Sequence, residues 1–151
     1  MSGNTIGIFE DDSRLLKMYG DVLRARGYRV FEARDAHVGL NILGKIRPDL
    51  VLLDVMMPNM NGFDACRRVR EVLGNDVPVV FLTSLDDVDS LRKAFEAGGN
   101  DFLSKSDPLE QVLESIAHWL AQRGRPQTAE ARDAVMAKLE GLGDRALARA
   151  F

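Results

Sequence analysis

Short apolar runs recur along the chain, and each is followed by a segment with helical periodicity. Most of the runs are continuous, which indicates strands buried on both faces, because no polar position is left for solvent. The expected strands are residues 5–9, 28–33, 50–53, 79–82 and 101–104. Strands that alternate with helices in this way form a parallel sheet with right-handed crossovers, so the predicted fold class is α/β.

Between the strands, apolar residues recur at intervals of three and four, as they do in helices that pack one face on a sheet. Helices are expected from Ser13 to a left-handed cap at Gly27, after Asp35, over residues 62–73, after Asp86 or Asp87, and over residues 109–122. The expected buried positions are Leu15, Tyr19, Val22 and Leu23; Val38, Ile42, Leu43 and Ile46; Phe63, Cys66, Val69 and Val72; Val88, Leu91, Ala94 and Phe95; and Val112, Leu113, Ile116 and Leu120.

The pattern changes near residue 124, where Gly, Arg, Pro and Gln follow one another and indicate a linker. The predicted organisation is therefore one domain over residues 1–123 and a linker with a helical extension over residues 124–151. A helix is expected over residues 128–140, with Ala131, Val135 and Leu139 on one face. The glycines of 141–143 predict an interruption before a last short helix.

Composition narrows the class of protein. Of 151 residues, 46% are hydrophobic and 28% are charged, an ordinary mixture for a soluble globular domain. The net charge of -3 argues against a nucleic-acid binder, and the extension, with five basic and four acidic residues, adds no basic patch. The single cysteine, Cys66, fits a reducing compartment. With no signal peptide and no apolar run of roughly 18–20 residues, we expect a cytoplasmic protein without membrane insertion.

Acidic residues follow two of the predicted strands. Glu10 and Asp11 come after the first strand, and Asp54 ends the third. The carboxyl ends of parallel strands meet at one edge of a sheet, so these carboxylates should lie close together. Their repulsion is relieved when one of them is protonated or when a cation binds. Mg²⁺ is the expected cation, with Mn²⁺ as an alternative, held by Asp11, Asp54, the backbone carbonyl of Met56, and Glu10 through water.

Asp54 is the expected nucleophile of this site, because a carboxylate can form an acyl phosphate with a metal neutralising the transferred group. Lys105 and Thr83, after the fifth strand and at the end of the fourth, could pair with phosphoryl oxygens. Taken singly, these residues have simpler interpretations. The acids at Glu10 and Asp11 could belong to the start of a helix, Thr83 could be an ordinary strand residue, and Lys105 could be a solvated surface lysine. Their joint occurrence at strand ends favours a phosphoryl-transfer site.

Residues 5–122 resemble the receiver domain of two-component response regulators. The matching segments are Phe9–Asp12, Leu52–Pro58 with Gly62, Val77–Ser84 and Ala97–Lys105. The resemblance implies a flavodoxin-like, doubly wound sheet of order 2-1-3-4-5, with Asp54 phosphorylated by a sensor histidine kinase or a histidine phosphotransfer protein. It also implies that Thr83 moves toward the phosphoryl group while Phe102, at the aromatic switch position, turns inward. The face formed by the fourth helix, fifth strand and fifth helix would then favour a downstream partner.

Two features depart from the family pattern. Ser106 follows Lys105 where the family usually has proline, often in a cis bond. A cis bond without proline costs about 2.5–4 kcal/mol, so a trans Lys105–Ser106 peptide is predicted. Met56 and Leu85 replace polar residues that could position an attacking water in some relatives. Loss of the phosphoryl group is therefore expected to take minutes to hours.

The predicted function is that of a stand-alone receiver: a signalling switch rather than an enzyme, which supports its own phosphotransfer and slow autodephosphorylation. One alternative is a degenerate receiver that acts as an interaction module without phosphorylation. Another is a hydrolase of the haloacid dehalogenase type, which would need an acid where Met56 stands. The extension could pack on its own domain, the preferred interpretation, or serve self-association into a homodimer or partner docking.

Overall fold

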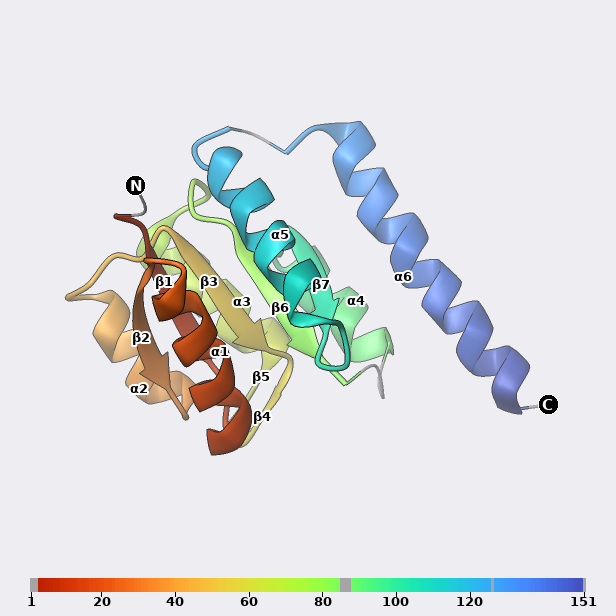
Figure 1. Cartoon of the computed structure of the whole chain (residues 1–151). Helices are drawn as coiled ribbons and strands as arrows, with labels where there is room; N and C mark the ends of the chain where they lie inside the picture. The colour runs from red at the N-terminus through yellow and green to blue at the C-terminus, as the bar shows by residue number, and fades with distance from the viewer. Residues whose placement is uncertain (1–2, 85–87, 126, 151) are drawn as a thin grey trace.

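A five-stranded parallel sheet forms the centre of the protein (Figure 1). The structure is a computed structural model that describes residues 3–84, 88–125 and 127–150, with side chains up to residue 141. The strands are β1 (Thr5–Phe9), β2 (Arg29–Ala33), β3 (Leu50–Asp54), β6 (Val79–Thr83) and β7 (Asp101–Ser104). Their order, β2-β1-β3-β6-β7, is the predicted 2-1-3-4-5. The order reverses between β1 and β3, and the carboxyl ends of strands at such a reversal are where open α/β sheets bind ligands.

Helices cover both faces of the sheet (Figure 1). One layer holds α1 (Ser13–Ala25) and α5 (Leu109–Ala121), and the other holds α2 (Ala36–Leu43), α3 (Gly62–Leu73) and α4 (Val88–Glu96). Every residue of β3 and β6 is buried, as their continuous apolar runs predict. Gly27 follows α1 with a φ of 90°, the left-handed cap expected from the sequence.

Several helix faces differ from the prediction. In α1, Leu16 and Gly20 are buried with Tyr19 and Leu23, while Leu15 and Val22 are half-buried. In α5, Trp119 is buried, and Leu113 and Leu120 are half-buried. In both helices the buried face is rotated by about one residue from the predicted face. A spacing of three and four cannot resolve such a rotation when apolar residues lie on both sides of the buried face.

The predicted face of α2 is wrong at Val38 and Ile46, which are exposed. The helix instead presents Ala36, Gly39 and Leu43 to the sheet. A Cβ on Gly39 would lie 2.5 Å from the Phe9 ring, so the small residues let α2 approach closely and the larger Val38 points outward. Ile46 lies beyond the end of the helix. Phe63 and Val72 of α3 are likewise exposed, and Ala65 and Leu73 take their places in the core.

A short antiparallel pair, which the sequence did not predict, lies between β3 and α3. It consists of β4 (Met56–Met57) and β5 (Met60–Asn61), joined by a turn in which Asn59 has a φ of 70°. Asn is one of the residues that tolerates this left-handed conformation. The pair gives the segment after Asp54 a defined shape.

The C-terminal extension is a single helix, α6 (Ala129–Ala150). The predicted interruption at residues 141–143 is wrong, because an isolated glycine lowers helix stability by only about 1 kcal/mol and does not force a break. Val135 and Leu139 are buried in the same cluster as α3 and α4, and Ala131 is half-buried, as their common face predicts. Within the described part of the chain, no helix has the length and apolar character needed to cross a bilayer.

Candidate functional site

Three acidic side chains meet at the carboxyl edge of the sheet. Glu10 follows β1, Asp11 comes next, and Asp54 ends β3, and their carboxylate oxygens lie within 4.8 Å of one another. β1 and β3 are paired neighbours, with Phe9 opposite Leu53, so the topology itself brings the two strand ends together. Glu10 is fully buried and Asp54 is 1% exposed, whereas Asp11 is half-buried.

Lys105 supplies the positive charge of this cluster. Its Nζ lies 2.7 Å from Glu10 Oε1 and 3.1 Å from Asp54 Oδ2. The lysine directly follows β7, and its backbone N–H donates to the Thr83 carbonyl at 2.8 Å, so the β6–β7 pairing fixes its base. The solvated surface lysine that the sequence left open is excluded, because this ammonium pairs with two buried carboxylates.

Electrostatics at the site follow from this packing. Burial, and after it the neighbouring Asp54, raise the pKa of Glu10 to about 8, against the opposing effect of Lys105. Burial lowers the pKa of Lys105, but Glu10 and Asp54 outweigh it and hold the pKa above its usual value. The site therefore carries a protonatable acid beside a permanent cation.

The segment after Asp54 is held by backbone contacts. Met56 N–H donates to Asp54 Oδ1 at 3.0 Å, and Gly62 N–H donates to the Val55 carbonyl at 2.9 Å. A Cβ on Gly62 would lie 2.9 Å from Val55 Cα, so only glycine allows α3 to begin this close to the end of β3. Asn61 caps α3 by accepting from Asp64 N–H at 2.8 Å. These contacts fix the conformation of the loop that follows Asp54.

The remaining predicted positions are as follows. Thr83 ends β6, beside the strand of Asp54, and is buried. Asp12 caps α1, accepting from Arg14 and Leu15 N–H. The Lys105–Ser106 peptide is trans, which confirms that prediction, and no described peptide bond is cis. Leu85, Asp86 and Asp87 lie outside the described residues.

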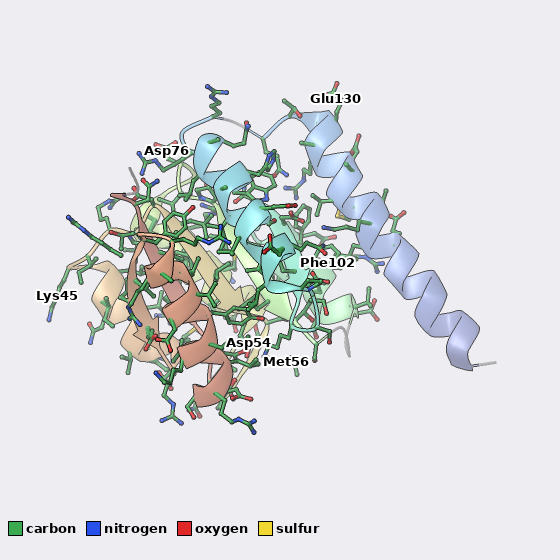
Figure 2. The ribbon with its side chains drawn as sticks, viewed as in Figure 1. Lys45, Asp54, Met56, Asp76, Phe102 and Glu130 are labelled. Carbon is green, nitrogen blue, oxygen red and sulfur yellow. The ribbon has the colours of Figure 1, made fainter. Side chains whose placement is uncertain are left out.

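Phe102 lies on β7 on the side of the sheet that faces α6 (Figure 2). Its side chain is 5% exposed and belongs to the same apolar cluster as Val135 and Leu139. Sequence reasoning missed the neighbouring Asp101, whose Oδ2 accepts from the Trp119 indole at 3.1 Å and whose Oδ1 lies 3.0 Å from Lys138 Nζ. The one available signal was a carboxylate at the start of an apolar strand, which called for a partner.

The acidic cluster fits a hard divalent cation. Glu10, Asp11 and Asp54 offer only oxygen donors, and such ligands suit Mg²⁺ and similar ions. Two of these carboxylates are buried and now rely on one lysine and on the protonation of Glu10 for neutralisation. Figure 2 shows Asp54 at the sheet edge with Met56 beside it, on the loop that would complete such a site.

Comparison with known proteins agrees with this geometry. Residues 6–117 match the family model of the response regulator receiver domain. The chain is 33% identical over 129 residues to the response regulator MprA of Mycolicibacterium vanbaalenii, which covers 85% of this chain and 55% of that protein. The chain belongs to the response regulator receiver domain family. It spans about half the length of the curated relatives it matches.

Solved structures show the same fold. A response regulator from Chloroflexus aurantiacus is 32% identical, with a TM-score of 0.73 over 80% of this chain and 99% of that one. The receiver domain of a Pseudomonas aeruginosa sensor histidine kinase is 26% identical, with a TM-score of 0.72 over 80% of this chain and 99% of that one. That structure has a magnesium ion coordinated in its active-site cleft. The chain is thus a two-component signalling receiver.

Proposed function

We propose that Asp54 accepts a phosphoryl group from a sensor histidine kinase or a histidine phosphotransfer protein and thereby switches this receiver. The observation that carries the proposal is the cluster of the buried Glu10 and Asp54 with the half-buried Lys105 and Asp11. A structural ion pair would need one acid for one lysine. The surplus of carboxylates in one crevice instead suits a cation and a nucleophile.

In the proposed reaction, Asp54 Oδ attacks the phosphorus of a phosphohistidine. The new O–P bond forms as the P–N bond breaks, and the leaving imidazole keeps the electron pair and takes up a proton. Lys105 pairs with one phosphoryl oxygen, and the Thr83 hydroxyl donates to another. Asp11, Asp54 and the Met56 carbonyl would hold Mg²⁺, with Glu10 acting through water. When bound, the ion neutralises charge on the transferred group.

The switch serves signalling rather than turnover of a substrate. Receiver residues 1–123 would carry the phosphoryl chemistry, and residues 124–151 would form the linker and extension. Thr83 and Phe102 are the proposed switch residues, acting on the face of α4, β7 and α5. Met56 offers no polar atom to an attacking water, so the phosphoryl group should be lost slowly.

The direct test is modification of Asp54 by a small phosphodonor. The full chain is incubated with acetyl phosphate and Mg²⁺, and the mass of the intact protein and of its peptides is measured. One phosphoryl group should appear on the peptide that contains Asp54 and should be absent in Asp54→Asn or after chelation of Mg²⁺. Asp89→Asn, which removes an exposed acid of α4, is the matched control and should be modified normally. Failure of the wild-type reaction would refute phosphorylation and favour a phosphorylation-independent interaction module.

Light scattering with Mg²⁺ and beryllium fluoride, a phosphoryl mimic, tests how the signal leaves the protein. A molar mass that doubles only with the mimic would identify a homodimer as the output. An unchanged mass would point to a separate downstream protein.

A further inference from the structure

Helix α6 lies against α4 and the edge strand β7 (Figure 1). Val135 and Leu139 enter the apolar cluster that contains Phe95 of α4 and Phe102 of β7. Among residues 129–141, the part of α6 with described side chains, these two are the buried ones. Since β7 pairs only with β6 in the sheet, α6 covers an edge strand that is otherwise open to another chain.

Basic side chains of α6 complete this contact. Lys138 Nζ lies 4.4 Å from the centroid of the Phe102 ring and 3.0 Å from Asp101 Oδ1. Arg132 Cζ lies 4.7 Å from the centroid of the Phe95 ring. A cation over an aromatic face is attracted by the ring, so the surface of α4 and β7 is suited to a helix with basic and aliphatic residues.

The contact is anchored on the strand that also leads to the phosphoryl site. Asp101 and Phe102 open β7, and Lys105, which bridges Glu10 and Asp54, directly follows its end. Asp101 also accepts from the Trp119 indole, so it links α5, β7 and α6. A displacement of β7 along its length would therefore reach both Lys105 and α6.

The described contacts between α6 and the rest of the protein contribute only modest stability. The Lys138 side chain is 50% exposed, and an exposed ion pair contributes little net stability. Two buried side chains are few for residues 129–141, the stretch of α6 whose side chains the structure describes. Such a helix can leave its surface without unfolding the sheet.

We propose that α6 is an intramolecular regulatory segment that occupies the α4–β7 surface and is released by phosphorylation of Asp54. This coupling rests on the proposed function. A phosphoryl group on Asp54 moves the negative charge outward, and Lys105 follows it. The end of β7 then shifts away from the position to which Lys138 and Leu139 are fitted. Release uncovers Phe95 and Asp101 for a partner helix with the same basic and aliphatic character.

Hydrogen exchange of the full chain measures the release. Backbone amides of residues 132–141 are compared with Mg²⁺ alone and with Mg²⁺ plus beryllium fluoride. Because most of the stability of a helix in a protein comes from its tertiary packing, exchange should become about tenfold faster or more when α6 undocks. Asp54→Asn should show no change. Unchanged or slower exchange in wild-type protein that acetyl phosphate does modify would overturn α6 release and leave the proposed function standing. Absence of any modification at Asp54 would overturn both.

Substitutions in α6 give the reciprocal test. Coupled binding equilibria are symmetric, so weakening the α6 contact should tighten the binding of beryllium fluoride to the protein with Mg²⁺ by roughly fivefold or more. Lys138→Ala removes the ion pair with Asp101 and the cation contact with the Phe102 ring, and Leu139→Ala removes the buried anchor. Lys45→Ala is the matched lysine control, since Lys45 is exposed and lies on the far side of the molecule (Figure 2). Equal beryllium fluoride affinities in wild type, Lys138→Ala and Leu139→Ala would contradict the coupling.

Discussion

The free energy of unfolding of the metal-free protein should fall as the pH rises, and Glu10 should cause much of the fall. Burial, with Asp54 as a further cause, raises the pKa of Glu10 from 4.5 to about 8 in the folded protein. The folded chain therefore binds this proton more tightly than the unfolded chain does. The resulting stabilisation is complete below about pH 4.5 and is lost as the pH rises through about 8.

The size of the effect follows from the same two pKa values. A difference of about 3.5 pH units, at about 1.4 kcal/mol per unit, corresponds to at most about 5 kcal/mol. The partly exposed Lys105 admits water to the site, so a fall of about 2–4 kcal/mol is expected. This is a large share of the stability of an ordinary domain, about 5–15 kcal/mol.

The perturbation is Glu10→Gln, which keeps the volume of the side chain and removes its titration. Urea unfolding followed by circular dichroism, with EDTA present, is measured between about pH 5 and about pH 8.5. The wild-type protein should lose stability relative to Glu10→Gln over this range. Glu110→Gln, at an exposed acid of α5, should keep the wild-type slope. Parallel curves for wild type and Glu10→Gln would refute the assigned electrostatics.

Three further results are expected. Gly62→Ala should lower the free energy of unfolding by about 1–3 kcal/mol in urea titrations, because the new Cβ meets the Val55 backbone. It should also slow the modification of Asp54 by acetyl phosphate, and unchanged values of both would contradict this. Cys66 is fully buried, and burial raises its pKa to about 11, so a thiol reagent should label it at neutral pH only after unfolding; rapid native labelling would exclude that burial. Met56→Asn should shorten the lifetime of phosphorylated protein at least roughly tenfold in a mass-spectrometric time course, since an amide can position water; an unchanged lifetime would remove Met56 as the cause of slow loss.

Much of the site could be predicted from the sequence because short runs of apolar residues identify the strands of a parallel sheet. Continuous apolar runs marked β3 and β6 as buried strands, and the residues after each run had to meet at one edge. The same argument applies to the strands that precede Glu10 and Lys105, and it explains why these two side chains meet Asp54. The trans Lys105–Ser106 peptide was also predictable, from the local cost of the cis form.

Helix faces and loop structure needed the tertiary packing. Val38 is exposed because Gly39 lets α2 approach the Phe9 ring closely, and helical spacing cannot rank a glycine above a valine. The β4–β5 pair depends on two-residue strands too short to carry a periodic signal. The complete burial of Glu10, beside the half-buried Asp11, depends on the angle at which the chain leaves β1.

The sequence by itself determined the strands, the strand ends that carry the acids, and the apolar face of the extension, while the sheet order was implied only by the family resemblance. It could not determine where α6 lies, because a helix with Val135 and Leu139 on one face can pack on any apolar surface of suitable shape. That choice is made by residues far apart in the chain, where Lys138 meets Asp101 and Phe102. Periodicity reports which side of an element is buried, and only tertiary structure decides against what.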